Sequence, residues 1–177
     1  NRYSDADLAE FKALINAKEA QMQQLKNAIS SALLDFEGKG LTVVQKNGKI
    51  YVSMENKLLF NSGSWAVGVE GKNAVEQLAS VLSENPDINV LIEGHTDNVP
   101  YNGSTLLDNW DLSVKRATAI VRILKSKGVD PTQITAAGRS EFVPISDNTS
   151  SEGKAKNRRI EIILAPNLDE ISKLLKE

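Results

Sequence analysis

The sequence contains no cysteine, only one histidine and few aromatic residues. Without cysteine the chain has neither disulfide bonds nor a thiol nucleophile, and cysteine-bearing zinc sites are excluded as well. With one histidine, a metal site built from several histidines is excluded, and any catalytic triad would have to use this one residue. No apolar run approaches the ~20 residues that cross a bilayer as a helix. These absences argue against thiol, zinc and membrane-spanning functions.

An excess of positive charge is also missing. The chain has 21 Lys and Arg residues against 23 Asp and Glu residues, which gives a net charge of −2. Such a chain has no broad positive field to hold nucleic acid or anionic lipid, so we expect no nucleic-acid partner. Its 177 residues, 41% of them hydrophobic, suffice for one packed core with an appendage.

A long helix is predicted over residues 5–37. Ser4 can cap its start, with Asp7 at capping-box spacing. Two interpretations are open: a coiled-coil stalk that pairs with a second copy, or an amphipathic helix lying on its own domain. We favour the stalk because the helix is long and consists mostly of Ala, Lys, Gln and Glu outside its apolar stripe. The stripe follows spacings of three and four over four repeats, interrupted once at Lys18: Leu8, Phe11, Ile15, Met22, Leu25, Ile29, Ala32 and Phe36.

Strands and helices alternate in the rest of the chain. Asn47-Gly48 is a strong hairpin signal within residues 41–54. Patterns of period two and 3.6 then predict further elements in this order: an irregular link at 58–68, a helix at 70–84, a strand at 88–93, a helix at 111–127, a strand at 134–139, a polar loop at 140–156, a strand at 159–164 and a short helix at 168–176.

This order predicts an α/β (α+β) two-layer sandwich, in which a mixed sheet carries helices on one face. We divide the chain into an N-terminal helical linker or coiled-coil stalk (1–38), a folded domain (39–166) and a short C-terminal helix (167–177).

One pair of charged residues suggests a binding site. Asp97 follows the strand at 88–93, and Arg116 lies one turn inside the helix at 111–127. Taken alone, Asp97 could simply form a turn. Arg116 alone could simply lie on a solvated helix face. Together, a fixed carboxylate and a fixed guanidinium suit a small zwitterion, such as the free end of an amino acid.

Other chemistries are less well supported. His95 lies two residues from Asp97, but no third ligand stands nearby, so we predict no metal site and no cofactor. Glu93 and Asp97 could be paired carboxylates for glycoside cleavage, although Glu93 is expected to point across the sheet. No serine lies in a Gly-x-Ser-x-Gly turn. We therefore expect a binding domain and not an enzyme.

Three segments together resemble the OmpA-like peptidoglycan-binding domain, a family that includes the OmpA C-terminal domain, the Pal lipoproteins and the MotB stators. They are Gly94-His95-Thr96-Asp97-Asn98, then Leu112-Ser113 with Arg116-Ala117, then Asn157-Arg158-Arg159. The resemblance runs from about residue 49 to 164. The long helix and the hairpin are most similar to OmpA-family proteins of Bacteroides-like bacteria, and the segment 98–111 is more similar to MotB.

The resemblance implies a role for each candidate residue. Asp97 would bind the amino group of diaminopimelate in the stem peptide of the cell wall, and Arg116 its carboxylate. Asn61, where the family commonly has aspartate, belongs to a loop that contacts the ligand. The remaining candidates would line or flank the same pocket: Thr96, Asn109, Leu112 and Ser113 as lining residues, Asn157 and Arg159 as the flank.

The resemblance also implies a biological role. Peptidoglycan is the expected partner, and the domain would tether the outer membrane or an envelope complex to the wall from the periplasm of a Gram-negative cell. Membrane contact is expected only through a segment upstream of Asn1. An alternative is a stator-like or other envelope assembly module, in which the N-terminal helix dimerises and wall binding is secondary.

Overall fold

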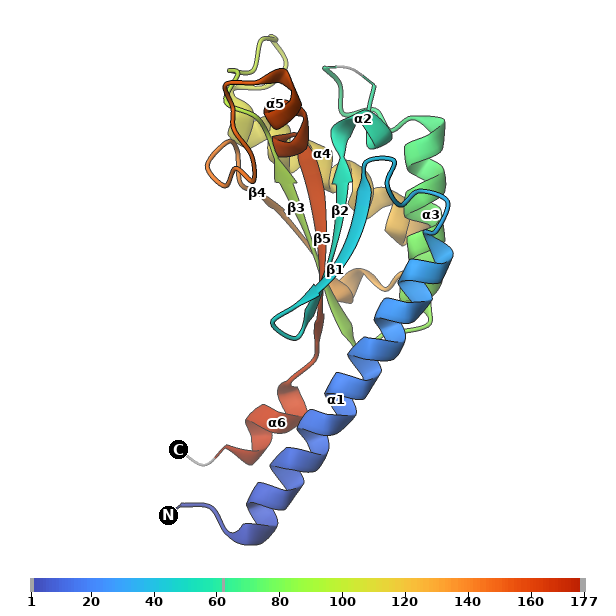
Figure 1. Cartoon of the computed structure of the whole chain (residues 1–177), viewed down its shortest axis with the longest axis vertical. Coiled ribbons are helices and arrows are strands. Elements are labelled where there is room, and N and C mark those ends of the chain that lie inside the picture. The colour runs from blue at the N-terminus through green and yellow to red at the C-terminus, as the bar shows by residue number, and fades with distance from the viewer. Residues whose placement is uncertain (1, 62, 176–177) are drawn as a thin grey trace.

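The computed structural model describes residues 2–61 and 63–175. Its centre is a five-stranded sheet in the order β1-β2-β5-β3-β4. Strands β3 and β4 are parallel, and the other neighbours are antiparallel (Figure 1). The strands are β1 (Leu41–Lys46), β2 (Lys49–Glu55), β3 (Ile88–His95), β4 (Ile134–Gly138) and β5 (Arg159–Pro166).

Helices cover one face of this sheet. Helix α4 packs on β3 and β4, α3 packs beside α4, and the long helix α1 packs beside α3 (Figure 1). The predicted mixed sheet with helices on one face is therefore confirmed. The helices are α1 (Asp5–Ala32), α2 (Asn56–Leu59), α3 (Val69–Ser83), α4 (Asn109–Ser126), α5 (Ser151–Asn157) and α6 (Asp169–Leu174), with a 3-10 turn, η1, at Pro131–Gln133.

Alternating side chains build the core between the sheet and the helices. In a strand, successive side chains point to opposite faces, so every second residue is directed toward the helices. The buried residues on this face are Ile50, Val52 and Met54 of β2, Ile88, Val90 and Ile92 of β3, and Ile160, Ile162 and Leu164 of β5. The predicted hairpin is confirmed, because Asn47 and Gly48 both have positive φ, 53° and 76°, as a two-residue hairpin turn requires.

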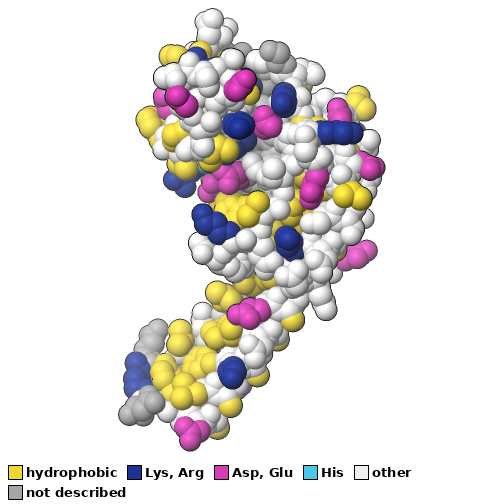
Figure 2. Space-filling view, viewed as in Figure 1, with side chains coloured by type: hydrophobic (Ala, Val, Ile, Leu, Met, Phe, Trp, Pro, Cys, Tyr) yellow, Lys and Arg dark blue, Asp and Glu magenta, His cyan; other side chains and the backbone are white. Residues whose placement is uncertain are grey.

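Helix α1 has two halves with different surroundings. Met22, Leu25 and Ile29 in its C-terminal half are buried in the core of the domain, whereas Leu8 and Ile15 are 47% and 45% exposed. Figure 2 shows hydrophobic side chains gathered where the N-terminal half of α1 and helix α6 extend beyond the sheet. The second half of the apolar stripe thus serves the chain's own core, and coiled-coil pairing of the first half stays a prediction.

The burial of Leu25 leads to a stability prediction. Leu25→Ala should lower the free energy of unfolding by about 3 kcal/mol, because it removes a buried side chain and leaves a cavity. Urea denaturation followed by circular dichroism measures this change. The control is Leu8→Ala, which should change stability by less than about 0.5 kcal/mol because Leu8 is half exposed. Equal, small effects of both substitutions would show that α1 does not pack on the sheet in solution.

Most predicted boundaries are within two residues of the structure, but three predicted segments differ more clearly. The first helix ends at Ala32 instead of residue 37, and turns follow it up to Gly40. The expected polar loop at 140–156 contains most of α5, which Ser150 caps by accepting a hydrogen bond from the Gly153 backbone N–H at 3.0 Å. The expected irregular link begins inside α2. Residue 176 of the predicted C-terminal helix lies outside the described residues.

The two ends of the chain lie together, away from α2 and α5 (Figure 1). The C-terminal ends of β2 and β3 lie at the opposite end of the molecule, beside α2, α5 and the start of α4. Among the described residues, every helix is too short or too polar to cross a bilayer.

Candidate functional site

Two neighbouring glycines bring α4 close to the sheet. Gly94 of β3 pairs with Gly138 of β4. A Cβ atom at Gly94 would lie 2.0 Å from the backbone oxygen of Ser113, and one at Gly138 would lie 2.4 Å from its Oγ. Only glycine permits an approach this close. The first turns of α4 are therefore held against the end of β3, next to Asp97.

Asp97 is fixed by two hydrogen bonds. Its Oδ1 accepts a hydrogen bond from the Val99 backbone N–H at 3.0 Å, which forms a turn directly after β3. Its Oδ2 accepts a hydrogen bond from Nη1 of Arg158 at 2.6 Å, and these two atoms also form an ion pair. The Asp97 side chain is buried, so its carboxylate is held in one position at the end of the sheet.

Arg116 is held from its sides, and its terminal nitrogens remain accessible. Its Nε donates a hydrogen bond to the Ser64 carbonyl at 3.0 Å, and its Cζ lies 5.4 Å from the centroid of the Phe60 ring. Burial and the nearby positive charge of Arg158 lower the pKa of the Arg116 guanidinium, while Asp97 opposes this shift. Among residues 2–61 and 63–175, no group pairs with the two terminal nitrogens.

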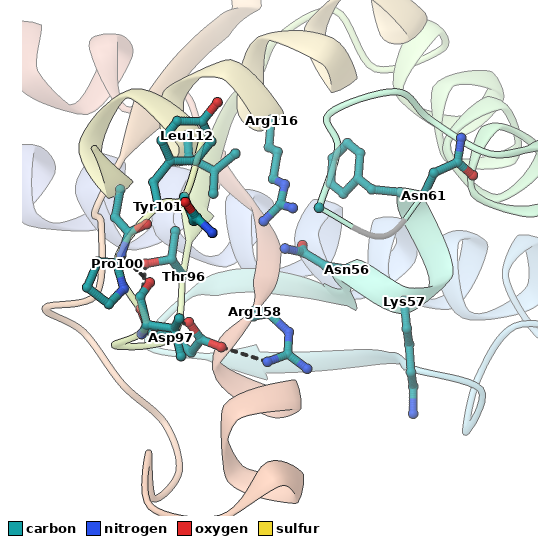
Figure 3. Close-up of a pocket in the computed structure, with 15 residues that line it drawn as sticks. Asn56, Lys57, Asn61, Thr96, Asp97, Pro100, Tyr101, Leu112, Arg116 and Arg158 are labelled. Atoms are coloured by element: carbon teal, nitrogen blue, oxygen red, sulfur yellow. Dashed lines mark hydrogen bonds and ion pairs between the residues drawn. The ribbon is translucent and has the colours of Figure 1, made fainter. Parts of the chain in front are cut away.

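Asp97 and Arg116 line the same pocket, which has a volume of about 670 Å³. In Figure 3 the two side chains face the cavity from the loop after β3 and from α4. Thr96, Asn109 and Leu112 also line it. The Thr96 hydroxyl donates a hydrogen bond to the Asp97 carbonyl at 2.8 Å, and the Asn109 amide donates one to the Val99 carbonyl at 3.0 Å, so both brace the Asp97 loop.

Asn61 lines the pocket, but its side chain points away from Asp97 and Arg116 in Figure 3. Ser62, which belongs to the same loop, lies outside the described residues.

Three predicted site residues do not line the pocket. Ser113 is fully buried against the sheet, where its hydroxyl donates to the Trp110 carbonyl and accepts from the Ser140 N–H. The Asn157 amide bonds the backbone of Ile145 and Ser146 and so fixes the preceding loop. Arg159 is buried, and its Nη2 forms an ion pair with Glu161 Oε2 at 2.6 Å. These residues support the fold around the site and are not placed to contact a ligand.

The chain matches the sequence model of the OmpA family over residues 59–158, which is more than half of its length. The chain belongs to the OmpA family. This match confirms the resemblance seen in the three sequence segments.

Sequence relatives of this OmpA-family chain include motility protein B of Bacillus subtilis, 30% identical over 155 residues, which are 84% of this chain and 59% of that protein. Probable lipoprotein YiaD of Escherichia coli is 36% identical over 131 residues, 74% of this chain and 58% of YiaD. The chain thus spans somewhat less than two thirds of the length of these relatives.

Solved structures show the same OmpA-family fold. A MotB-like protein from Desulfovibrio vulgaris has a TM-score of 0.79 with 26% identity, over 86% of this chain and 96% of that one. The cell wall anchor of the T6SS from Pseudomonas aeruginosa has a TM-score of 0.72 with 31% identity, over 78% of this chain and 96% of that one.

Among the pocket residues that sequence reasoning missed, two bear on the chemistry of the site. Arg158 precedes β5 and is paired with Asp97, and the Asn56 side chain lies in the cavity between Arg116 and Arg158 (Figure 3). Strand alternation could have identified Arg158. Arg159, Glu161 and Ile163 share the sheet face opposite the helices. Arg158 comes directly before the strand and is free to turn into the pocket. Nothing in the sequence distinguishes Asn56.

His95 is buried and does not line the pocket of this OmpA-family domain. Its Nε2 is 3.2 Å from Glu93 Oε1 and 3.6 Å from Glu161 Oε2. Burial, together with Arg159 and Arg139, lowers the pKa of His95 to about 3, so the ring is neutral near pH 7. In the described part of the chain no three His, Asp or Glu side chains gather as metal ligands. The hydrogen bond of the neutral ring therefore stays within β3, to Glu93.

Proposed function

We propose that this domain binds peptidoglycan without covalent chemistry, through the free end of diaminopimelate in the stem peptide. The observation that carries this proposal is the pair of terminal nitrogens of Arg116, which face the same cavity as the Asp97 carboxylate. A guanidinium fork binds a carboxylate through two parallel hydrogen bonds, and a carboxylate accepts an ammonium group.

The free end of diaminopimelate carries both groups on one carbon. Its carboxylate would bind Arg116, and its ammonium would share the Asp97 carboxylate with Arg158. The two oxygens of Asp97 offer about four acceptor sites, of which Val99 and Arg158 use two. A stem peptide with lysine at this position lacks the distal carboxylate and leaves Arg116 unpaired. The pocket therefore selects its ligand by charge and needs no reacting group.

This selectivity provides the test. Two soluble stem tetrapeptides that differ only in diaminopimelate or lysine at the third residue are titrated calorimetrically into the domain. Leaving a buried charged partner unpaired costs about 2–5 kcal/mol, so the lysine peptide should bind at least about thirtyfold more weakly. Equal affinity for both peptides, or no binding of the diaminopimelate peptide, would contradict the proposal.

A tethering role in the cell envelope follows from wall binding. The domain would hold an attached envelope structure to peptidoglycan, and we propose that it does so in the periplasm, in association with the outer membrane. Similarity to a cell wall anchor and to a probable lipoprotein supports this role.

The exposed half of α1 favours a second candidate function, a stator-like or other envelope assembly module that dimerises through this helix. Similarity to motility protein B and the exposed residues Leu8 and Ile15 support it. Analytical ultracentrifugation of the wild type and of a Leu8→Lys, Ile15→Lys variant tests it. A wild-type dimer that becomes monomeric in the variant would support assembly, and a monomeric wild type would exclude it. Removing all of residues 1–37 is unsuitable, because Met22, Leu25 and Ile29 belong to the core.

A further inference from the structure

The pocket holds a buried amide, that of Asn56. Asn56 is only 6% exposed and lines the pocket, and among residues 2–61 and 63–175 neither its Oδ1 nor its Nδ2 has a hydrogen-bond partner. A buried amide without partners is unfavourable, so its retention points to a ligand that supplies them. The backbone fixes its position, because the Asn56 N–H donates to the Arg158 carbonyl at 2.8 Å.

The charge of the pocket also exceeds what a zwitterion can neutralise. Facing the cavity are the guanidinium groups of Arg116 and Arg158 and a single carboxylate, Asp97. Lys57 stands at the rim, 69% exposed and paired with Glu55 at 3.6 Å, and it points away from Asp97 in Figure 3. The cluster therefore carries one net positive charge, which a neutral zwitterion leaves unchanged. When a ligand ammonium shares Asp97, Arg158 loses part of its counter-charge.

We propose that Asn56 and Arg158 form a second subsite, which binds a further carboxylate of the same stem peptide. This inference rests on the proposed function and adds a requirement to it. The ligand must present an ammonium and two carboxylates: one carboxylate for Arg116 and one for Arg158 and the Asn56 Nδ2. The Asn56 Oδ1 would accept a hydrogen bond from a peptide N–H beside the second carboxylate.

Two groups of a stem tetrapeptide have this chemistry: the α-carboxylate of its γ-linked glutamate and its C-terminal carboxylate. Converting either one to a carboxamide removes the charge with little change in shape. The domain would therefore distinguish amidated from unamidated stem peptides, in addition to diaminopimelate from lysine.

The experiment combines three peptides with four proteins. The parent diaminopimelate tetrapeptide, its glutamate α-carboxamide and its C-terminal carboxamide are titrated into the wild type, Arg158→Gln, Asn56→Leu and the control Lys156→Gln, whose exposed residue lies outside the pocket. The wild type and the control should bind one of the two amidated peptides roughly tenfold more weakly than the parent. The identity of that peptide shows which carboxylate occupies the subsite. The Arg158→Gln variant should bind the parent peptide more weakly than the wild type does. It should also bind all three peptides with similar affinity.

Asn56→Leu separates binding from folding. Replacing an unpartnered buried amide with an apolar side chain of similar size should leave the melting temperature unchanged or raise it. The same variant should bind the parent peptide several-fold more weakly. A purely structural Asn56 would show a lower melting temperature with unchanged affinity, and that result would overturn its assignment to the subsite.

The outcomes distinguish this inference from the proposed function. If the wild type prefers diaminopimelate to lysine but binds all three tetrapeptides equally, the second subsite is wrong and the proposed function stands. If the Arg158→Gln variant still distinguished the parent from the amidated peptides as the wild type does, Arg158 would not belong to the subsite. If the wild type does not bind the parent peptide, the proposed function fails, and this inference fails with it.

Discussion

Arg116→Ala is expected to weaken binding of a diaminopimelate tetrapeptide at least about thirtyfold, because the ligand carboxylate loses its partner at a cost of about 2–5 kcal/mol. The same variant should no longer sediment with purified peptidoglycan sacculi. Its fold should persist, since Arg116 contributes one hydrogen bond, to Ser64, and one contact with the Phe60 ring. Calorimetric titration measures the affinity, and circular dichroism verifies the fold.

A matched control lies on the same helix. Arg122 is exposed and outside the pocket, so Arg122→Ala removes the same charge and should bind normally. Arg116→Lys keeps the charge but loses the planar fork, and its affinity should fall roughly tenfold. Asp97→Ala should also abolish sedimentation with sacculi. Retained binding in both alanine variants would remove Asp97 and Arg116 from the site.

Gly94→Ala is expected to lower the free energy of unfolding by about 3 kcal/mol, near the upper end of the usual effect of overpacking. The added Cβ would lie 2.0 Å from the Ser113 backbone oxygen, so α4 would have to move away from β3. Since Arg116 lies on α4 and Asp97 follows β3, the same shift should misalign the pocket. Affinity should therefore fall in protein that is still folded at 25 °C.

Gly68→Ala is the control for this prediction. Its added Cβ would meet its nearest neighbour, Asn61 Oδ1, at 3.6 Å, which is ordinary contact, so stability should change by no more than about 1 kcal/mol. Urea denaturation and peptide titration compare the two variants. A Gly94→Ala protein with wild-type stability and affinity would show that the close approach of α4 does not position the site.

Local patterns in the sequence predicted most of the elements. Asn47-Gly48 marked the hairpin, and the apolar alternation at 159–164 marked β5. The position of β5 between β2 and β3 was not predictable in this way, because it depends on pairings far apart along the chain. The burial of Met22 and Leu25 was missed because a coiled-coil stripe and a core-facing stripe have nearly the same spacing.

The structure brings Asp97 and Arg116, the central pair of the predicted site, into one pocket, but not all the residues expected around them. Asp97 and Arg116 could be identified because their chemistry and spacing suit one ligand. The family resemblance implied that Ser113 lines the pocket. The absence of side chains at Gly94 and Gly138 instead lets Ser113 pack against the sheet. The role of Asn56 depends on its lack of partners in three dimensions, which no sequence pattern expresses.

The location of both chain ends has a practical and a mechanical consequence. They lie at the opposite end of the molecule from the pocket (Figure 1), so a bulky group fused to either one leaves the mouth of the pocket unobstructed. The 28 residues of α1 make a rod about 40 Å long. A load applied through the N-terminus would therefore pull along this rod and reach the sheet through Met22, Leu25 and Ile29 before it reached the pocket.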